Sequence, residues 1–206
     1  MKKIIISLCL GMSLLALAAC TAEDGTSQAT GTSVSSSLSA QQNPTAAYKD
    51  QRLAMDKVTY GVQADNFAGG SSLATLTSYF GQPTKSEQSP SGNVTLDVYT
   101  WQLGQVKIQA SLFQDSTVAL SISNFYFTRE ESITKKTYQK LSKGMSYAKV
   151  EELLGKPDDY SKAVSSDGEE MQALWVSGLR SQKSNPRITL TFKEGLLDKI
   201  TSENLS

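Results

Sequence analysis

The stretch that decides the fold occurs twice, as FAGGSSLATLTSYFGQP at residues 67–83 and as LSKGMSYAKVEELLGKP at residues 141–157. At this offset of 74 residues, five positions are identical and the apolar positions also coincide. The same offset places Trp101 on Trp175, and these are the two tryptophans of the chain. Self-similarity at a fixed offset is typical of a duplicated unit, so we interpret the folded part as two copies of one module.

Each copy contains the signature of a capped helix. Ser72 and Ser146 stand where an N-cap residue belongs, and apolar residues follow them at i, i+3 and i+7 spacing. Gly81 and Gly155 suit the left-handed conformation of a helix C-cap, and a proline two residues later ends each helix. We expect shorter helical segments before these helices, at residues 48–57 and 135–141.

Three extended runs with alternating apolar residues follow each helix and predict antiparallel strands. The fold class predicted is therefore α+β, with two helices covering one face of the sheet in each module. The first module spans residues 48–128 and the second spans residues 129–206. The expected strands are residues 94–103, 106–114 and 118–125 in the first module and 171–176, 187–193 and 196–201 in the second.

The composition narrows the chemistry that the chain can perform. It contains no histidine, which excludes Ser-His and Cys-His catalysis and histidine-based zinc sites. Lysine plus arginine and aspartate plus glutamate number 20 each, so a general attraction to nucleic acid is not expected. The sequence has no glycine-rich phosphate cradle, no metal-ligand cluster and no nucleophile paired with a base. We therefore predict no nucleic-acid partner, no metal, no cofactor and a function without catalysis.

Residues 1–19 have the pattern of a bacterial lipoprotein signal peptide. A basic start at residues 2–3 precedes an apolar run that ends in LAAC at residues 17–20, which is a lipobox. An ordinary secretory signal followed by a cysteine is the alternative. We expect cleavage before Cys20 and anchoring in the membrane through a lipid on its thiol. Cleavage also removes Cys9, so the mature chain would have one thiol and no internal disulfide.

Residues 20–47 are predicted to form a lipid-anchored, flexible tether. Residues 21–47 contain 11 serines and threonines among 27 residues and only two charged residues. Such a segment cannot bury enough apolar surface to become ordered. A coil of this length would hold the folded part on the order of 30 Å from the bilayer. This length suggests a lipoprotein that reaches through a thick wall, and so favours the extracytoplasmic face of the cell membrane in a Gram-positive bacterium.

The repeated motif resembles that of β-lactamase-inhibitor-protein-like (BLIP-like) modules. It reads GMS at residues 144–146, valine at 150 and LGKP at residues 154–157. The small envelope-assembly lipoproteins of the SmpA/OmlA (BamE-like) type share this module. The tandem arrangement most resembles Gram-positive lipoproteins that carry a domain of unknown function. The resemblance implies two helix-helix-strand-strand-strand modules that join into one continuous, saddle-shaped antiparallel sheet, with the helices on the convex face.

The alternation within the strands predicts an aromatic face for binding a partner. Val94, Leu96 and Val98 would pack beneath the helices, which places Trp101 on the opposite, concave face. Exposed aromatic residues with basic neighbours mark contact sites between proteins. The alternative is that both tryptophans fill equivalent packing sites within the modules. The candidate residues of this face are Tyr99, Trp101, Lys107, Phe113, Trp175, Arg187 and Lys193.

These observations favour a surface lipoprotein that binds an unknown protein partner and modulates a cell-envelope enzyme. One alternative is β-lactamase inhibition, but the family's inhibitor carries an acidic residue and an aromatic at the first hairpin tip. This chain reads GQV there, at residues 104–106, so we expect no inhibition. An envelope-assembly factor of the BamE type is a second alternative. A carboxylate-based wall enzyme is a third, although we interpret Asp158, Asp159, Glu169 and Glu170 as solvated loop charges.

Overall fold

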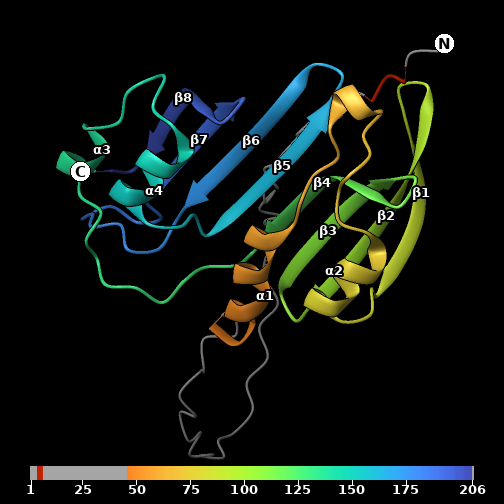
Figure 1. The fold of residues 1–206 in the computed structure, drawn as a ribbon. Coiled ribbons are helices and arrows are strands. Elements are labelled where there is room, and N and C mark those ends of the chain that lie inside the picture. Colours follow the sequence, from red (N-terminus) through yellow and green to blue (C-terminus); the bar gives the residue numbers. More distant parts are fainter. Residues whose placement is uncertain (1–3, 7–45, 206) are drawn as a thin grey trace, which may run out of the picture. The chain divides into compact units, whose positions relative to one another are not determined.

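Eight antiparallel strands form one sheet in the computed structural model, and their order in the sheet is their order in the sequence (Figure 1). The structure describes residues 4–6 and 46–205, so Cys20 and nearly all of the predicted tether lie outside the described residues. The antiparallel sheet expected from the sequence is confirmed. The strands are β1 (Lys85–Ser91), β2 (Val94–Leu103), β3 (Val106–Phe113), β4 (Ser116–Ser123), β5 (Asp159–Ser165), β6 (Gly168–Trp175), β7 (Arg187–Lys193) and β8 (Leu196–Glu203).

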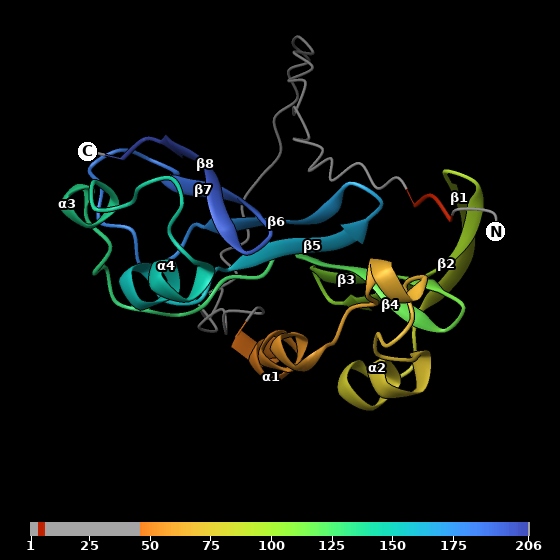
Figure 2. The ribbon, with the colours of Figure 1, turned by 45° about the horizontal axis from the view of Figure 1, so that its top comes forward.

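Short helices precede each group of four strands. Helices α1, α2 and α4 lie on one face of the sheet (Figure 2). None of the helices among the described residues is long and apolar enough to span a membrane. The α-helices are α1 (Lys49–Ala54), α2 (Leu73–Phe80), α3 (Lys135–Tyr138) and α4 (Tyr147–Leu154), and the 3-10 helices are η1 (Ala46–Tyr48), η2 (Met55–Lys57) and η3 (Gln63–Asp65).

The caps of α2 and α4 are those that the repeated motif predicts. The hydroxyls of Ser72 and Ser146 each accept a hydrogen bond from the backbone N–H three residues later, at 3.2 and 3.3 Å. Gly81 and Gly155 end the helices with φ angles of 83° and 72°. A residue with a side chain is strained at such positive φ values, which explains the glycine at both C-caps.

The prediction of three strands in each module is wrong, because β1 and β5 were not expected. Strand β1 reads KSEQSPS and its side chains are mostly exposed, so it has no alternating apolar residues. It lies at one edge of the sheet, where Pro90 is tolerated. Strand β5 reads DYSKAVS and buries its two leading residues, which breaks the period-two pattern. Strand β1 is therefore held in the sheet by its pairing with β2 rather than by a buried apolar face, whereas β5 buries Tyr160 and Ala163 without a regular alternation.

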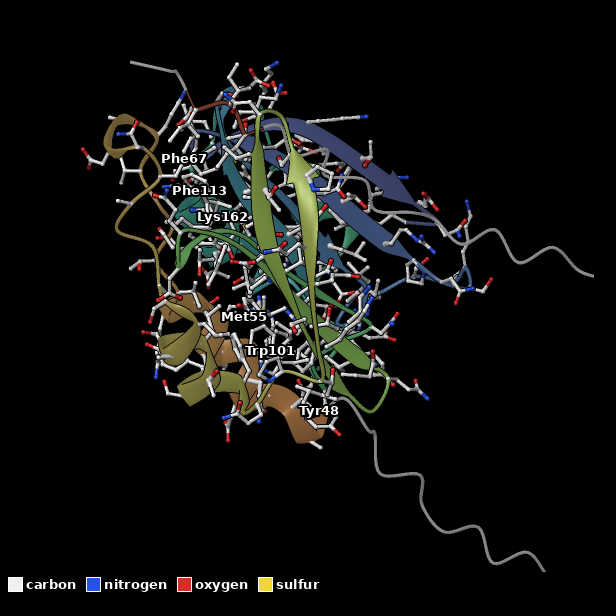
Figure 3. The ribbon with its side chains drawn as sticks, turned by 90° about the vertical axis from the view of Figure 1, so that its right-hand side faces the viewer. Tyr48, Met55, Phe67, Trp101, Phe113 and Lys162 are labelled. Atoms are coloured by element: carbon white, nitrogen blue, oxygen red, sulfur yellow. The ribbon has the colours of Figure 1, made fainter. Side chains whose placement is uncertain are left out.

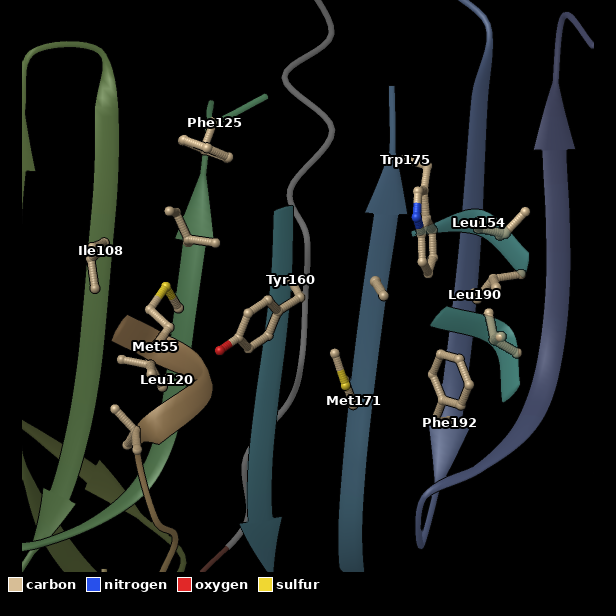
Figure 4. Close-up of a cluster of buried hydrophobic side chains, with 14 of the residues drawn as sticks. Met55, Ile108, Leu120, Phe125, Leu154, Tyr160, Met171, Trp175, Leu190 and Phe192 are labelled. Atoms are coloured by element: carbon tan, nitrogen blue, oxygen red, sulfur yellow. The ribbon is translucent and has the colours of Figure 1, made fainter. Parts of the chain in front are cut away.

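The main hydrophobic core lies between the helices and the sheet and runs continuously across both groups of strands. Met55 packs there with Tyr160 and Met171, near the middle of the sheet (Figure 4). Trp101 and Trp175 are both 0% exposed within this core. The core therefore joins the two halves of the chain rather than forming two separate clusters.

The prediction of which side chains of β2 and β6 point toward the helices is wrong, because the opposite face of each strand does so. Trp101 lies directly opposite Ile108, and Trp175 lies directly opposite Ile188. Opposed residues in an antiparallel pair share a face, so both tryptophans point toward the helices with their isoleucine partners. Leu96 points to the other face, where it belongs to a second, smaller apolar cluster.

The two tryptophans occupy equivalent positions. The indole N–H of Trp101 donates to the carbonyl of Gly81 at 2.8 Å, and that of Trp175 donates to the carbonyl of Gly155 at 3.0 Å. Each ring thus ties a strand to the C-terminal end of the helix above it. Filling of equivalent packing sites, the alternative interpretation of the tryptophans, agrees with this arrangement.

A buried arginine fastens α1 to the segment that leads into β5. Arg52 is 0% exposed, and its guanidinium donates to the carbonyls of Pro157 at 2.8 Å and Asp158 at 3.1 Å. It also pairs with Asp56 at 3.0 Å. The guanidinium carbon lies 4.6 Å from the centre of the Tyr160 ring, within range of a cation–π interaction. The first half of the chain is therefore held to the second by buried hydrogen bonds from a charged side chain.

Candidate protein-binding face

The face of the sheet opposite α1, α2 and α4, here called the open face, carries a row of polar side chains. The pairing of neighbouring strands aligns one residue from each of β2 to β8 in this row. All but the last are half-buried, and the last is exposed. The row consists of Thr100, Gln109, Ser121, Ser161, Gln172, Thr191 and Lys199.

The chemistry of this row suits contact with another protein rather than catalysis. Six of its seven side chains are uncharged hydroxyls or amides, which both donate and accept hydrogen bonds. Short neutral side chains on a sheet form a surface that costs less to desolvate than a charged one. Such groups also adapt to several hydrogen-bonding patterns, as serine and asparagine do in antibody paratopes.

One end of the open face is hollowed. The hollow has a volume of about 620 Å³ and lies where β4 and β6 end and where β5 and β7 begin. Its floor and rim combine apolar, amide and charged groups, the mixture expected of a contact site. Tyr126 and Val176 are the most exposed apolar side chains at its edge, each at 38%. The lining residues are Gln105, Asn124, Phe125, Tyr126, Asp159, Leu174, Val176 and Arg187.

Asp159 is the acidic group of the hollow. Its two carboxylate oxygens accept hydrogen bonds from the backbone N–H groups of Phe125 at 2.8 Å and Asn124 at 2.9 Å. Burial raises the pKa of Asp159 to about 7, although these two hydrogen bonds and the nearby Arg52 oppose the change. The side chain therefore exchanges its proton near neutral pH, where a partner that fills the hollow would alter the balance.

Asp158 is an anchor for the surrounding chain rather than a reactive group. Its carboxylate accepts from the backbone N–H of Val176 at 2.7 Å, from the N–H and hydroxyl of Ser177 at 2.8 and 2.6 Å, and from the N–H of Phe127 at 2.8 Å. Arg129 completes the set with an ion pair at 2.9 Å. These donors surround both oxygens, so the carboxylate holds two separate stretches of backbone in place.

The interpretation of Asp158 and Asp159 as solvated loop charges is wrong, because both are buried. They follow Gly155 and Pro157, which indicate a turn in the sequence, although Asp159 is the first residue of β5. Glu169 and Glu170 are also not loop residues, because both lie in β6 and are half-buried, and Glu169 forms an ion pair with Lys162 at 2.8 Å. Across residues 4–6 and 46–205, no group of three or more acidic or cysteine side chains is placed to hold a metal ion.

The aromatic face predicted from the sequence does not form. Trp101 and Trp175 are buried under the helices, and Phe113 is buried in the second apolar cluster. Tyr99 is half-buried, with its ring 6.5 Å from that of Trp101. The expected flank of basic residues is partly present, because Lys107 and Lys193 are exposed and Arg187 lines the hollow.

The structure adds residues that sequence reasoning missed. The sequence does not single out Tyr126 or Val176 as candidates. Tyr126 follows the predicted strand at residues 118–125, and Val176 is the last residue of the predicted strand at residues 171–176. A signal for Tyr126 was present in the alternation of Phe125, Tyr126 and Phe127. Only Phe125 of these is fully buried, so the chain turns Tyr126 outward to the hollow.

Fold and surface together define an α+β protein built on an eight-stranded antiparallel sheet, with helices on one face and a polar, hollowed face opposite. Residues 47–205 match a family described as a domain of unknown function with a solved structure (DUF3862), and the chain belongs to this family. It is similar to the crystal structure of a "putative beta-lactamase inhibitor protein" from Streptococcus mutans, at 46% sequence identity and a TM-score of 0.73. The match covers 77% of this chain and 98% of that chain. No curated protein matches this chain.

Proposed function

We propose that this chain is a lipid-anchored surface protein that binds a protein partner through the open face of its sheet and catalyses no reaction. The observation that carries the proposal is the continuous polar row across seven strands, with the hollow at its end. Of the residues that line the hollow, Asp159 alone carries a carboxyl group. Hydrolysis by paired carboxylates requires a second one, so the wall-enzyme alternative loses its support there.

The proposal includes two tandem modules, residues 48–128 and 129–206, that share one saddle-shaped surface. The equivalence of the two tryptophan–glycine hydrogen bonds supports a duplication. A further match lies beside them: the N–H of Gln102 donates to Thr84 at 3.1 Å, and the N–H of Val176 donates to Asp158 at 2.7 Å. Both pairs obey the offset of 74 residues that the sequence shows.

A cell-envelope enzyme is the kind of partner that we propose, and a β-lactamase is the first to test. The name of the Streptococcus mutans relative supports this choice. The turn between β2 and β3 offers Gln105 at the rim of the hollow, without the acidic residue and aromatic of the inhibitor that the fold resembles. Any inhibition would therefore rest on the open face and the hollow rather than on a plug at this turn.

A photo-crosslinker placed on either face of the sheet tests the proposal. We would introduce benzoylphenylalanine at Gln172, in the polar row, and at Lys149, an exposed residue of α4 on the helical side. Irradiation of cells that carry the full-length protein should give a defined crosslinked product from position 172 and none from position 149. Crosslinking from position 149 alone would contradict the proposed face.

Purified protein added to a β-lactamase tests whether inhibition depends on the hollow. Val176→Asp places a charge at the hollow, and Val62→Asp places the same charge at a site that is 51% exposed elsewhere on the surface. If the enzyme is the partner, the Val176 variant should lose inhibition while the Val62 variant keeps it. Inhibition that survives in both variants would place the contact outside the hollow.

A further inference from the structure

Ile4–Ile6 pack against an apolar cluster at the end of the sheet opposite the hollow, and the surface that they cover is here called the groove. The groove is formed where β1 turns into β2 and where β5 turns into β6. Ile6 is 0% exposed within the second apolar cluster. Figure 3 shows two residues of this cluster, Phe67 and Phe113, at the end of the sheet away from Met55 and Trp101. The apolar residues of the groove are Phe67, Val94, Leu96, Phe113, Val118 and Val164.

The groove also contacts the backbone of its occupant. Ile5 donates its N–H to the side-chain oxygen of Asn93 at 2.8 Å, and the N–H of Asn93 donates back to the carbonyl of Ile5 at 3.3 Å. The carbonyl of Ile6 accepts from the N–H of Ser166 at 3.0 Å and from its hydroxyl at 2.9 Å. An acyl chain or detergent could use none of these four contacts, whereas any extended peptide could use them all.

Gly92 allows this close approach. It has a φ angle of 62°, and a Cβ atom at this position would collide with the carbonyl of Ile5. Glycine is therefore required for two reasons, the turn conformation and the proximity of a second backbone. Glycine commonly marks a position where another backbone approaches closely.

Predicted processing before Cys20 would remove the occupant of the groove. Ile4–Ile6 belong to the predicted signal peptide, so the mature chain would expose the apolar side chains that these residues cover. The surface left behind combines apolar side chains with the N–H groups of Asn93 and Ser166, the Ser166 hydroxyl and the Asn93 side-chain oxygen.

We propose that the groove of the mature protein binds an extended aliphatic segment of a partner protein. One branched side chain of that segment takes the position of Ile6, and its backbone pairs with Asn93 and Ser166. This site goes beyond the proposed function, since the hollow and the groove lie at opposite ends of the strands. Failure of binding at either site would leave the other intact.

A peptide probe tests the groove directly. The probe is KKIIIS, which corresponds to residues 2–7, with fluorescein at its N-terminus, and the protein is the chain from residue 20 onward with Cys20→Ser. Fluorescence anisotropy should show saturable binding. The same peptide with Ile6→Asp should bind at least about tenfold more weakly, because a carboxylate would have to enter an apolar pocket.

Two adjacent substitutions provide matched protein variants. Val94→Asp places a charge in the groove, whereas Thr95→Asp places it on the next residue of β2, which points away from the cluster. Val94 is only half-buried even with the occupant present, so both variants should fold, as circular dichroism would verify. We expect Val94→Asp to weaken binding at least about tenfold and Thr95→Asp by less than about twofold.

Three results would overturn the proposal. The first is the absence of saturable binding up to about 1 mM peptide, the weakest affinity that a specific contact of this kind would have. The second is equal affinity for the two peptides. The third is retention of residues 1–19 in the exported protein, shown by mass spectrometry, because the groove would then remain filled by its own chain.

Discussion

The indole N–H of Trp175 donates to the carbonyl of Gly155 at 3.0 Å, and the ring is completely buried. The hydrogen bond satisfies one of the carbonyls left unpaired at the end of α4. It also fixes the distance between that helix and β6. The tryptophan is therefore part of the scaffold that supports the open face, rather than a residue of the face itself.

Substitution of either tryptophan should destabilise the protein without changing the open face directly. Trp175→Phe removes the donor and part of the ring, and should lower the free energy of unfolding by about 1–3 kcal/mol. Trp101→Phe should have a similar effect, because its hydrogen bond to Gly81 is equivalent. Guanidinium denaturation measures both changes.

Tyr99→Phe is the control, since it keeps the ring and alters a half-buried residue. An equal loss of stability in that variant would contradict the role of the indole hydrogen bond.

The side chain of Arg52 should be among the most costly to replace. Arg52→Met leaves the buried carbonyls of Pro157 and Asp158 without their donor, which should cost about 2–5 kcal/mol. Arg52→Lys should recover only part of this loss, because a single ammonium does not reproduce the fork of the guanidinium.

The matched control for Arg52 is Arg180→Met, which changes the same side chain at an exposed position. It should alter the free energy of unfolding by less than about 0.5 kcal/mol. Thermal unfolding of the three variants beside the parent protein gives the comparison. If Arg52→Met and Arg180→Met unfold alike, the contact between α1 and the β5 segment does not hold the two halves together.

The repeated helix was predictable from sequence because its determinants are local. Ser72 and Ser146 cap through their own backbone neighbours, and Gly81 and Gly155 adopt their φ angles within the same turn. The period of three to four residues then identifies the buried side of each helix. All of this information lies within about two helical turns, so it does not depend on the rest of the fold.

The orientation of β2 was not predictable from its own residues, because both of its faces are partly apolar. Leu96 and Val98 are buried on one face, and Trp101 is buried on the other. Only the pairing with β3 decides which face meets the helices. The two-residue turn at Gly104 and Gln105 sets that pairing and places Trp101 opposite Ile108. Register, rather than alternation alone, would have identified the correct face.

The hollow could not be found in the sequence, because its residues come from five separate segments. Asp159 and Leu174 meet only because β5 and β6 pair in the observed register. Strand β5 itself lacks a recognisable pattern, and its burial is imposed by neighbouring strands. The helices were predictable because their determinants are local in sequence, whereas the candidate site depends on how distant strands pair.

Asp159 should make stability depend on pH in the direction opposite to most carboxylates. Its pKa is raised from 3.8 to about 7 in the folded protein, mainly by burial. Between these values the folded state binds more protons than the unfolded state, so the free energy of unfolding falls as pH rises. The contribution is fully present below pH 3.8 and is lost as the pH passes about 7, with an upper limit of about 4 kcal/mol.

Denaturation at several pH values tests this dependence. Asp159→Asn replaces the titrating group by an amide. The free energy of unfolding of the parent protein, minus that of this variant, should therefore decrease from pH 4 to pH 7. Asp167→Asn, at an exposed turn, is the control and should keep the pH dependence of the parent protein. A constant difference between the parent and Asp159→Asn over this range would show that the carboxyl titrates in its ordinary range.

The lipid anchor is tested by two cysteine substitutions within the N-terminal 20 residues, most of which lie outside the described residues. Cys20→Ser should abolish incorporation of labelled palmitate and leave residues 1–19 uncleaved, because acylation requires the thiol and precedes cleavage at a lipobox. Cys9→Ser changes the same side chain inside the apolar run and should leave labelling and cleavage intact. Palmitate labelling measures the acylation, and mass spectrometry measures the cleavage.

Labelling that persists in Cys20→Ser would place the lipid elsewhere, and cleavage at another residue would indicate an ordinary secretory signal. Either result would contradict the proposal of a lipid anchor at Cys20.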